Sequence, residues 1–261
     1  MPAGAVQPQT YVVQFFALLR HSLAQLVRAP SHSQRKEAAR KLARHALLLT
    51  AILGACIVAL MVLLDAREIA LMPPRGTPDL WPVRILTDFG KDAYVLWLLA
   101  AILIVIALIS PALAAATRAR WLHFGTRVQY LFLAVLVPVL ASEVIKWSVG
   151  RGRPFVGGKA NSFNFAPFAG SEAYASFPSA HAVTGFALAF AVGALWPRAR
   201  PWMLIYAILI ALSRLVLLAH HPSDVVGGAL VGMVGAMAVR YWFAARQVGF
   251  EIHDGGKIVP R

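Results

Sequence analysis

Six long apolar runs constrain the fold of this chain more than any other feature of its sequence. A helix needs about 20 consecutive apolar residues to cross a bilayer. Runs of this kind occupy Ala46–Leu64, Ala93–Ala116, Val128–Val149, Pro178–Trp196, Pro201–Ala219 and Val225–Ala244. Hydrophobic residues make up 59% of the chain, against roughly half in soluble domains. We therefore predict an all-α integral membrane protein, with a bundle of six transmembrane helices over residues 46–246.

The residues that flank this bundle have different characters. Apolar residues recur with helical spacing near the N-terminus, at Val12, Phe15, Phe16, Leu19, Leu23, Leu26 and Val27. Because Arg20 and His21 interrupt this stretch too early for a span, the pattern favours an interfacial amphipathic helix. A flexible arm is the alternative for this part of the segment 1–45. The polar tail, residues 247–261, is predicted to be loosely ordered.

The basic residues indicate an orientation. If the six runs span the membrane in turn, 16 of the 25 Lys and Arg residues fall on the side of the N-terminus. Lys and Arg collect in cytoplasmic loops, so both termini are expected in the cytoplasm of a bacterial inner membrane. The net charge of +14 then reflects topology, and no nucleic-acid partner is expected.

Three polar segments fall together on the opposite, periplasmic face. Ionisable residues at membrane depth are costly and usually functional. The first segment, "KWSVGRGRPF" (146–155), brings Lys146, Arg151 and Arg153 close together. Such a cluster suits an anion with several oxygens, although basic residues at a lipid interface can also simply snorkel. Glu143, three residues before Lys146, could pair with it along the helix.

The second segment, "FPSAHA" (177–182), reads as the start of a helix. Ser179 is a candidate N-cap, and the free N–H groups of a first turn bind anions. His181 would lie in that turn, where a histidine can give a proton to a leaving oxygen. The alternative is an ordinary cap beside an interfacial histidine.

The third segment, "SRLVLLAHHPSD" (213–224), places Arg214 inside an apolar run and ends with two histidines and an aspartate. Arg214 needs an anionic partner at that depth. His220 and Asp224 are four residues apart, so the carboxylate could orient the imidazole as in an activated histidine nucleophile. Asp224 is within reach of His221 as well, and a purely structural polar network is the alternative.

Together the three segments resemble the signature of the type 2 phosphatidic acid phosphatase superfamily, which vanadium haloperoxidases share. The resemblance covers Lys146…Arg153-Pro154, Pro178-Ser179-Ala180-His181 and Ser213-Arg214…His220…Asp224. It implies that His220, rather than His221, attacks phosphorus, that Asp224 orients it, and that His181 protonates the leaving oxygen. The implied phosphate-binding residues are Lys146, Arg153, Ser179, Ala180 and Arg214. Ala180 departs from the family, which usually has glycine there.

The same resemblance implies an activity. The chain is expected to be a metal-independent phosphatase without cofactors, acting through a phosphohistidine on a lipid phosphate or diphosphate. Isoprenoid diphosphate, phosphatidyl phosphate and lipid A phosphate are the candidate substrates. A lipid phosphotransferase and a non-enzymatic lipid-binding protein remain alternatives. The aromatic residues of the link 159–177 fit either a membrane-interface belt or a rim for lipid, whereas Gly228 and Gly232 indicate helix packing.

Overall fold

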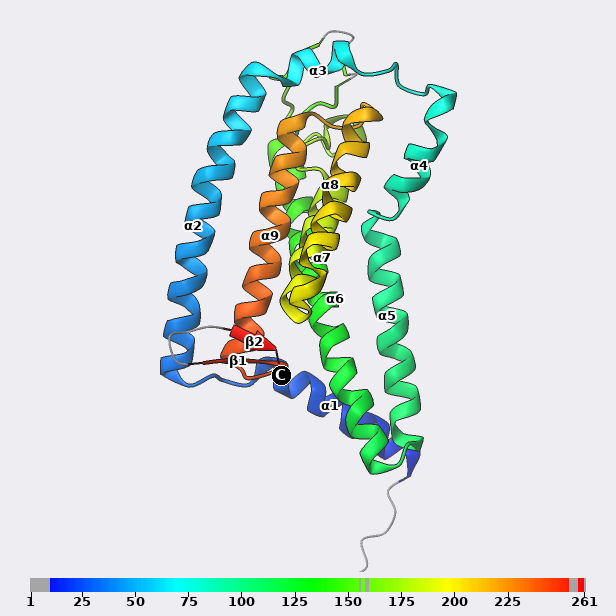
Figure 1. The fold of residues 1–261 in the computed structure, drawn as a ribbon, viewed down its shortest axis with the longest axis vertical. Coiled ribbons are helices and arrows are strands. Elements are labelled where there is room, and N and C mark those ends of the chain that lie inside the picture. Colours follow the sequence, from blue (N-terminus) through cyan, green and yellow to red (C-terminus); the bar gives the residue numbers. More distant parts are fainter. Residues whose placement is uncertain (1–9, 155, 158–159, 254–257, 261) are drawn as a thin grey trace, which may run out of the picture.

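The structure is a computed structural model that describes residues 10–154, 156–157, 160–253 and 258–260, most of them helical (Figure 1). The helices are α1 (Tyr11–Val27), α2 (His32–Leu63), α3 (Asp65–Leu71), α4 (Trp81–Asp88), α5 (Asp92–Ile109), α6 (Ala115–Val149), α7 (Ala180–Leu195), α8 (Arg200–Val216) and α9 (Pro222–Ala245). Short 3-10 helices lie at Pro78–Leu80, Ser110–Ala112, Glu172–Tyr174 and Pro197–Ala199. Strands β1 (Phe250–Ile252) and β2 (Ile258–Pro260) pair antiparallel.

Five helical segments of the described chain are long and apolar enough to cross a membrane. They are His32–Leu63, Pro78–Ala112, Ala115–Val149, Pro197–Val216 and Pro222–Ala245. The remaining predicted span corresponds to α7, which is apolar but has only 16 residues. At 1.5 Å per residue such a helix is about 24 Å long, shorter than the hydrocarbon core of about 30 Å. The five long apolar helices confirm the prediction of a multi-helix membrane protein.

Helix α7 lies inside the bundle, where small residues allow close packing with α9. Gly228 and Gly232 of α9 face the start and the middle of α7. A Cβ atom at Gly228 would lie 2.6 Å from the Ser179 carbonyl oxygen, and one at Gly232 would lie 2.4 Å from that of Val183. Both distances are too short for any side chain, so the two glycines do serve helix packing.

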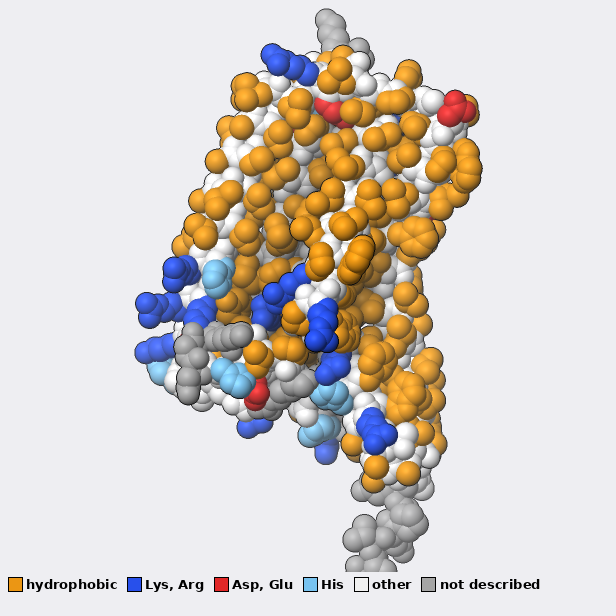
Figure 2. Space-filling model, viewed as in Figure 1, with side chains coloured by type: hydrophobic (Ala, Val, Ile, Leu, Met, Phe, Trp, Pro, Cys, Tyr) orange, Lys and Arg blue, Asp and Glu red, His pale blue; other side chains and the backbone are white. Residues whose placement is uncertain are grey.

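The outward surfaces of the bundle are apolar. Figure 2 shows hydrophobic side chains along the flanks of the bundle, with most of the visible Lys and Arg gathered at its lower end. Leu47 of α2 is 71% exposed and Trp202 of α8 is 73% exposed. Apolar surface of this extent is unfavourable in water, and lipid is the medium that suits it.

Several element boundaries differ from those expected from the sequence. Helix α2 begins at His32, well before the apolar run, because Ser31 accepts a hydrogen bond from the Gln34 N–H and no Gly or Pro follows until Gly54. Residues 117–127 belong to α6, and the segment 65–92 contains α3 and α4. Helices α2 and α6 start well before their apolar runs, since polar residues do not prevent helix formation, whereas α3 and α4 are separate short helices.

The C-terminal tail is also more ordered than predicted. Strands β1 and β2 form a hairpin, and Phe250 is fully buried with its ring 4.7 Å from that of Tyr130. The prediction of a loose tail is wrong for these strands, because two apolar residues anchor them to the core. At the same end of the bundle, α1 runs across the base (Figure 1), where Gln129 and Trp242 donate hydrogen bonds to Ser22 and to the Leu26 carbonyl.

Candidate active site

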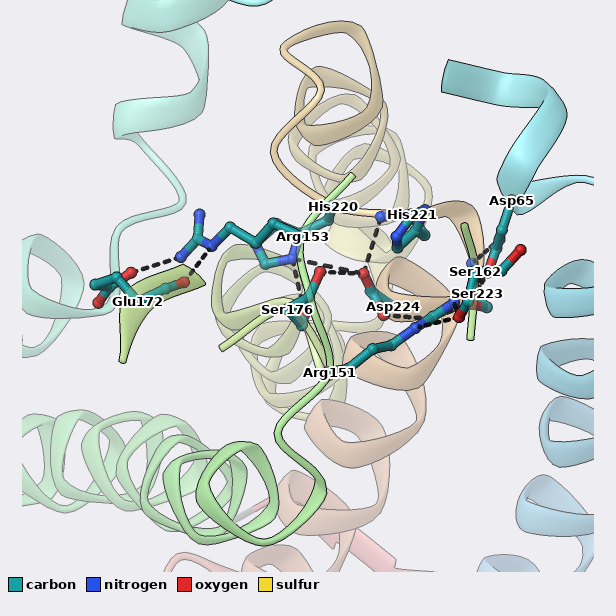
Figure 3. Close-up of polar contacts among 10 residues, drawn as sticks. All are labelled: Asp65, Arg151, Arg153, Ser162, Glu172, Ser176, His220, His221, Ser223 and Asp224. Atoms are coloured by element: carbon teal, nitrogen blue, oxygen red, sulfur yellow. Dashed lines mark hydrogen bonds and ion pairs between the residues drawn. The ribbon is translucent and has the colours of Figure 1, made fainter. Parts of the chain in front are cut away.

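The polar cluster at the other end of the bundle combines three segments that are far apart in the sequence. The link between α6 and α7, the turn between α8 and α9, and the first turn of α3 meet there (Figures 1 and 3). The predicted residues His220 and Asp224 lie in this cluster with Arg153 (Figure 3). Ser179 joins it through its backbone N–H, which donates to the Asp224 carbonyl oxygen at 3.0 Å.

His220 is held in one tautomer. Its Nδ1 lies 2.8 Å from the carbonyl oxygen of Ser176, and a carbonyl can only accept a hydrogen bond. Nδ1 therefore carries the proton, which leaves the lone pair on Nε2. Burial and the charges of Arg214 and Arg153 hold the pKa of His220 well below its usual value, so the imidazole is neutral and nucleophilic at neutral pH.

Asp224 organises the turn that carries His220. Its Oδ2 accepts hydrogen bonds from the Ser176 hydroxyl at 2.6 Å and from the His221 backbone N–H at 2.9 Å. The same oxygen lies 3.9 Å from Nδ1 of His220, which is close enough for charge stabilisation but too far for a hydrogen bond. Asp224 is thus connected to His220 through Ser176, whose hydroxyl contacts Asp224 and whose carbonyl contacts His220.

His221 has a different environment from its neighbour. Its side chain is fully buried and faces the Asp224 backbone N–H in the capping box at the start of α9, beside the backbone of Asp65. Burial lowers the pKa of His221, so its imidazole is also neutral. In Figure 3 its ring lies on the side of Asp65, whereas His220 lies on the side of Arg153. This geometry distinguishes the two histidines, which helix periodicity could not do.

Three buried polar atoms at signature positions have no hydrogen-bond partner among the described residues. They are Oγ of Ser179, Nε2 of His181 and Nε of Arg214. Ser179 is the N-cap of α7, as predicted, but its hydroxyl makes no capping bond. Arg214 uses Nη1 to bind the Thr87 hydroxyl at 2.9 Å. Buried polar atoms are normally paired, and these three suit an anion that accepts hydrogen bonds.

The other two predicted cations are paired with carboxylates at the rim. Lys146 binds Glu143, the pairing expected from their spacing. Arg153 binds the carboxylate of Glu172 at 2.7 Å and its carbonyl oxygen at 2.9 Å. The charge of Arg153 acts on both His220 and Arg214, and that of Lys146 acts on His181. Arg153 therefore lies near His220, and Lys146 lies near His181. Ala180, the first residue of α7, lies between Ser179 and His181.

Arg151 does not belong with the anion-binding cations. It is 1% exposed and forms ion pairs with Asp65 at 2.7 Å and with Asp224 at 2.6 Å (Figure 3). The expectation that it binds an external anion together with Lys146 and Arg153 is wrong, because two internal carboxylates occupy its guanidinium. Asp65 and Ser176 were not anticipated, since neither stands in a recognisable local pattern.

The chemistry of the cluster is that of an anion site. Among the described residues, no group of three or more His, Cys, Asp or Glu side chains is placed to hold a metal ion. The side chains at the signature positions are mostly cations and hydrogen-bond donors. A neutral histidine with a free lone pair, a second histidine and several donors could together transfer a phosphoryl group.

Comparison with known proteins agrees with this chemistry. The PAP2 superfamily matches residues 127–247. A protein of Rhizobium johnstonii named lipid A 1-phosphatase is 30% identical over 203 residues, which cover 77% of this chain and 82% of that protein. A lipid A 1-phosphatase of Rhizobium etli is 32% identical over 66% of this chain and 74% of that protein.

A third relative matches a shorter region. A protein of Escherichia coli K12, provisionally named an undecaprenyl-diphosphatase, is 32% identical over 46% of this chain and 61% of that protein. No solved structure matches the chain. The match to the superfamily includes all the signature residues, and the similarity to the Rhizobium proteins extends over most of both chains. The chain therefore belongs to the PAP2 superfamily.

Proposed function

We propose that this protein is a membrane phosphatase that removes phosphate from a lipid phosphate or diphosphate by way of a phosphohistidine. The observation that carries the proposal is the set of unpartnered buried atoms on Ser179, His181 and Arg214 near a histidine of fixed tautomer. Relatives named as lipid A 1-phosphatases make a lipid A phosphate the first candidate substrate. Undecaprenyl diphosphate follows from the third relative, and phosphatidyl phosphate remains a candidate.

In the first step, Nε2 of His220 attacks phosphorus and the bond from phosphorus to the leaving oxygen breaks. His181 enters this step as an imidazolium, stabilised by the bound phosphate anion, and gives its Nε2 proton to that oxygen. The imidazole of His220 becomes positively charged in the phosphohistidine. The Ser176 carbonyl, which accepts from Nδ1 at 2.8 Å, and the Asp224 carboxylate at 3.9 Å stabilise this charge.

In the second step, water attacks the phosphohistidine. His181, now neutral, accepts a proton from that water, and the bond from Nε2 of His220 to phosphorus breaks. Inorganic phosphate leaves, and His220 returns to its starting tautomer. An alcohol in place of water would make the enzyme a phosphotransferase.

The phosphoryl oxygens are held by cations and by the start of α7. Arg214, Arg153 and Lys146 supply positive charge, and Ser179 supplies a hydroxyl. The first-turn N–H groups of Ala180 and His181 add donors aligned with the helix dipole. Charge that builds up on the oxygens during transfer is therefore met by donors already in place, and the reaction is proposed to need no metal or other cofactor.

The site is proposed to face the periplasm of a bacterial inner membrane, with both termini in the cytoplasm. Basic side chains at the opposite end of the bundle support this orientation. In this arrangement α7 is the sixth span of a membrane domain covering residues 46–246. It starts below the membrane surface, which explains its 16 residues and places bound phosphate near the lipid headgroups. Helix α1 would lie on the cytoplasmic surface.

Phosphate release by the purified protein tests the proposal. The wild type is assayed with lipid A, undecaprenyl diphosphate and phosphatidyl phosphate, each with and without EDTA, beside His220→Ala and His221→Ala. Release from at least one lipid in EDTA, lost in His220→Ala and largely kept in His221→Ala, is expected. Loss of activity with EDTA, or the reverse behaviour of the two variants, would contradict the mechanism. Transfer of phosphate to added lipid alcohol in place of release would identify a phosphotransferase.

A further inference from the structure

The buried ion-pair cluster behind Asp224 connects α3 to the candidate active site. Its members are Asp65, Arg151, Ser223 and Asp224, and each has an exposed fraction of 1% or less. Asp65 lies outside residues 127–247, where the superfamily matches. The cluster contains two carboxylates and one guanidinium, so Arg151 is the cation that both carboxylates share (Figure 3).

Arg151 is fixed from several directions. One terminal nitrogen donates to Asp224 Oδ1 at 2.6 Å and to the Ser223 hydroxyl, and the other donates to Asp65 Oδ2 at 2.7 Å. Nε and the second terminal nitrogen also donate to the Ser162 carbonyl oxygen, at 3.2 and 2.8 Å. The planar fork of an arginine suits two carboxylates at once, which a lysine cannot reproduce.

Asp65 also contacts the first turn of α9 directly. Its Oδ1 accepts a hydrogen bond from the Ser223 backbone N–H at 3.0 Å, and its Oδ2 accepts one from the Ser223 hydroxyl. Asp65 is thus bound both to Arg151 and to the residue that precedes Asp224. The first turn of α9 carries Asp224, so the position of α3 is coupled to that of this carboxylate.

The carboxylate of Asp224 is also connected to His220, the proposed nucleophile. Asp224 accepts from the Ser176 hydroxyl, and the Ser176 carbonyl accepts from Nδ1 of His220. The backbone N–H of Ser176 donates to the Arg151 carbonyl oxygen at 3.0 Å, so Arg151 holds Ser176 as well as Asp224. A continuous set of hydrogen bonds therefore runs from α3 to the imidazole.

We propose that Asp65 and Arg151 are positioning residues that orient Asp224 and, through Ser176, fix the tautomer of His220. The proposal rests on the function proposed above. It assigns a role in the reaction to α3, whose sequence lies outside the superfamily match. Without the guanidinium, Asp65 and Asp224 would face one another as buried carboxylates, and one of them would take up a proton.

The test compares Asp65→Asn and Arg151→Lys with Arg67→Gln, a control that removes an exposed charge from α3. Phosphate release is measured over a range of pH and normalised to the folded fraction. The two positioning variants are expected to lower kcat by about 10- to 100-fold, the loss that is typical when a residue that orients a metal-binding side chain is replaced. KM should change by about two-fold at most. In Arg151→Lys the acid limb of kcat/KM should move to higher pH, because one ammonium group cannot contact both carboxylates as the guanidinium fork does.

The outcomes separate this inference from the proposed function. An inactive wild type, or a fully active His220→Ala, would overturn the function itself. An active wild type with inactive His220→Ala, but with kcat and pH profile unchanged in both positioning variants, would overturn the role of Asp65 and Arg151. A fall in total activity that merely follows the folded fraction would also overturn it, since that result shows a structural role only.

Discussion

At the scale of single residues, the site depends on which atoms remain free. The hydroxyl of Ser179, Nε2 of His181 and Nε of Arg214 have no partner in the described chain, whereas Asp224 and Arg151 are fully engaged with one another and their neighbours. Unpaired buried donors are unfavourable in the free protein. Two of these side chains, His181 and Arg214, lie near enough to act on the neutral His220, which favours a binding site over a structural polar network.

The rim cation Arg153 gives a prediction at this scale. In the free protein it is paired with Glu172, whose side chain is 91% exposed, and a phosphate must compete with that carboxylate. Glu172→Gln is expected to lower KM by about two- to five-fold, since exposed ion pairs contribute about 0.2–1 kcal/mol. Initial rates measured against lipid phosphate concentration, in low salt, would give the change in KM with kcat nearly constant.

Glu37→Gln is the matched control, because Glu37 is also exposed and pairs with Lys41 at 3.4 Å near the other end of the bundle. It should leave KM unchanged. An unchanged or raised KM in Glu172→Gln would show that Arg153 does not meet the phosphate.

At the scale of helices, the close packing of α7 on α9 sets the height of the phosphate-binding turn. Gly228→Ala would place a methyl group 2.6 Å from the Ser179 carbonyl oxygen and push that turn away from His220. We expect a loss of about 1–3 kcal/mol in unfolding free energy, the usual cost of overpacking, together with a fall in phosphate release.

Gly54→Ala is the control for that substitution. No atom lies within 4 Å of the position of its new Cβ, so the change should leave the protein as stable as the wild type or up to about 1 kcal/mol more stable. Thermal unfolding in one detergent would compare the two. Equal stability of Gly228→Ala and Gly54→Ala would contradict the packing described for α7.

The sequence predicted the elements better than their ends. Apolar runs located α5, α6, α8 and α9 because the bilayer requires a minimum apolar length. They did not reveal that α2 starts at His32, since this depends on a cap and on continued helix-forming residues. Nor did they reveal the pairing of Asp65 with Arg151, because 86 residues separate the two and no local spacing records such a contact.

At the scale of the whole molecule, Glu68 makes stability depend on pH. It lies on α3, is 3% exposed, and both its carboxylate oxygens lack partners among the described residues. Burial raises the pKa of Glu68 from 4.5 to about 8, and the nearby charges of Asp65 and Asp224 add to the effect. The pKa of Glu68 is higher in the folded than in the unfolded protein, so ionisation of this carboxyl opposes folding. The free energy of unfolding is therefore highest below about pH 4.5, and the difference is lost as the pH rises through about 8.

Glu68→Gln removes this dependence, because the amide stays neutral at every pH. Relative to the wild type, the variant should gain thermal stability between about pH 5 and about pH 8. Asp79→Asn, at an exposed site on the same side of the bundle, should show no such gain. Parallel melting curves for wild type and Glu68→Gln across this range would mean that Glu68 is ionised in the folded protein.

The measurement that tests the central claim most directly is the location of the covalent phosphoryl group. Purified protein is mixed with labelled lipid phosphate, quenched in alkali, which preserves phosphohistidine, and mapped by peptide mass spectrometry. The account predicts label on His220 in the wild type and in His221→Ala, and none in His220→Ala. Label on His221 or His181, or label that persists in His220→Ala, would contradict it.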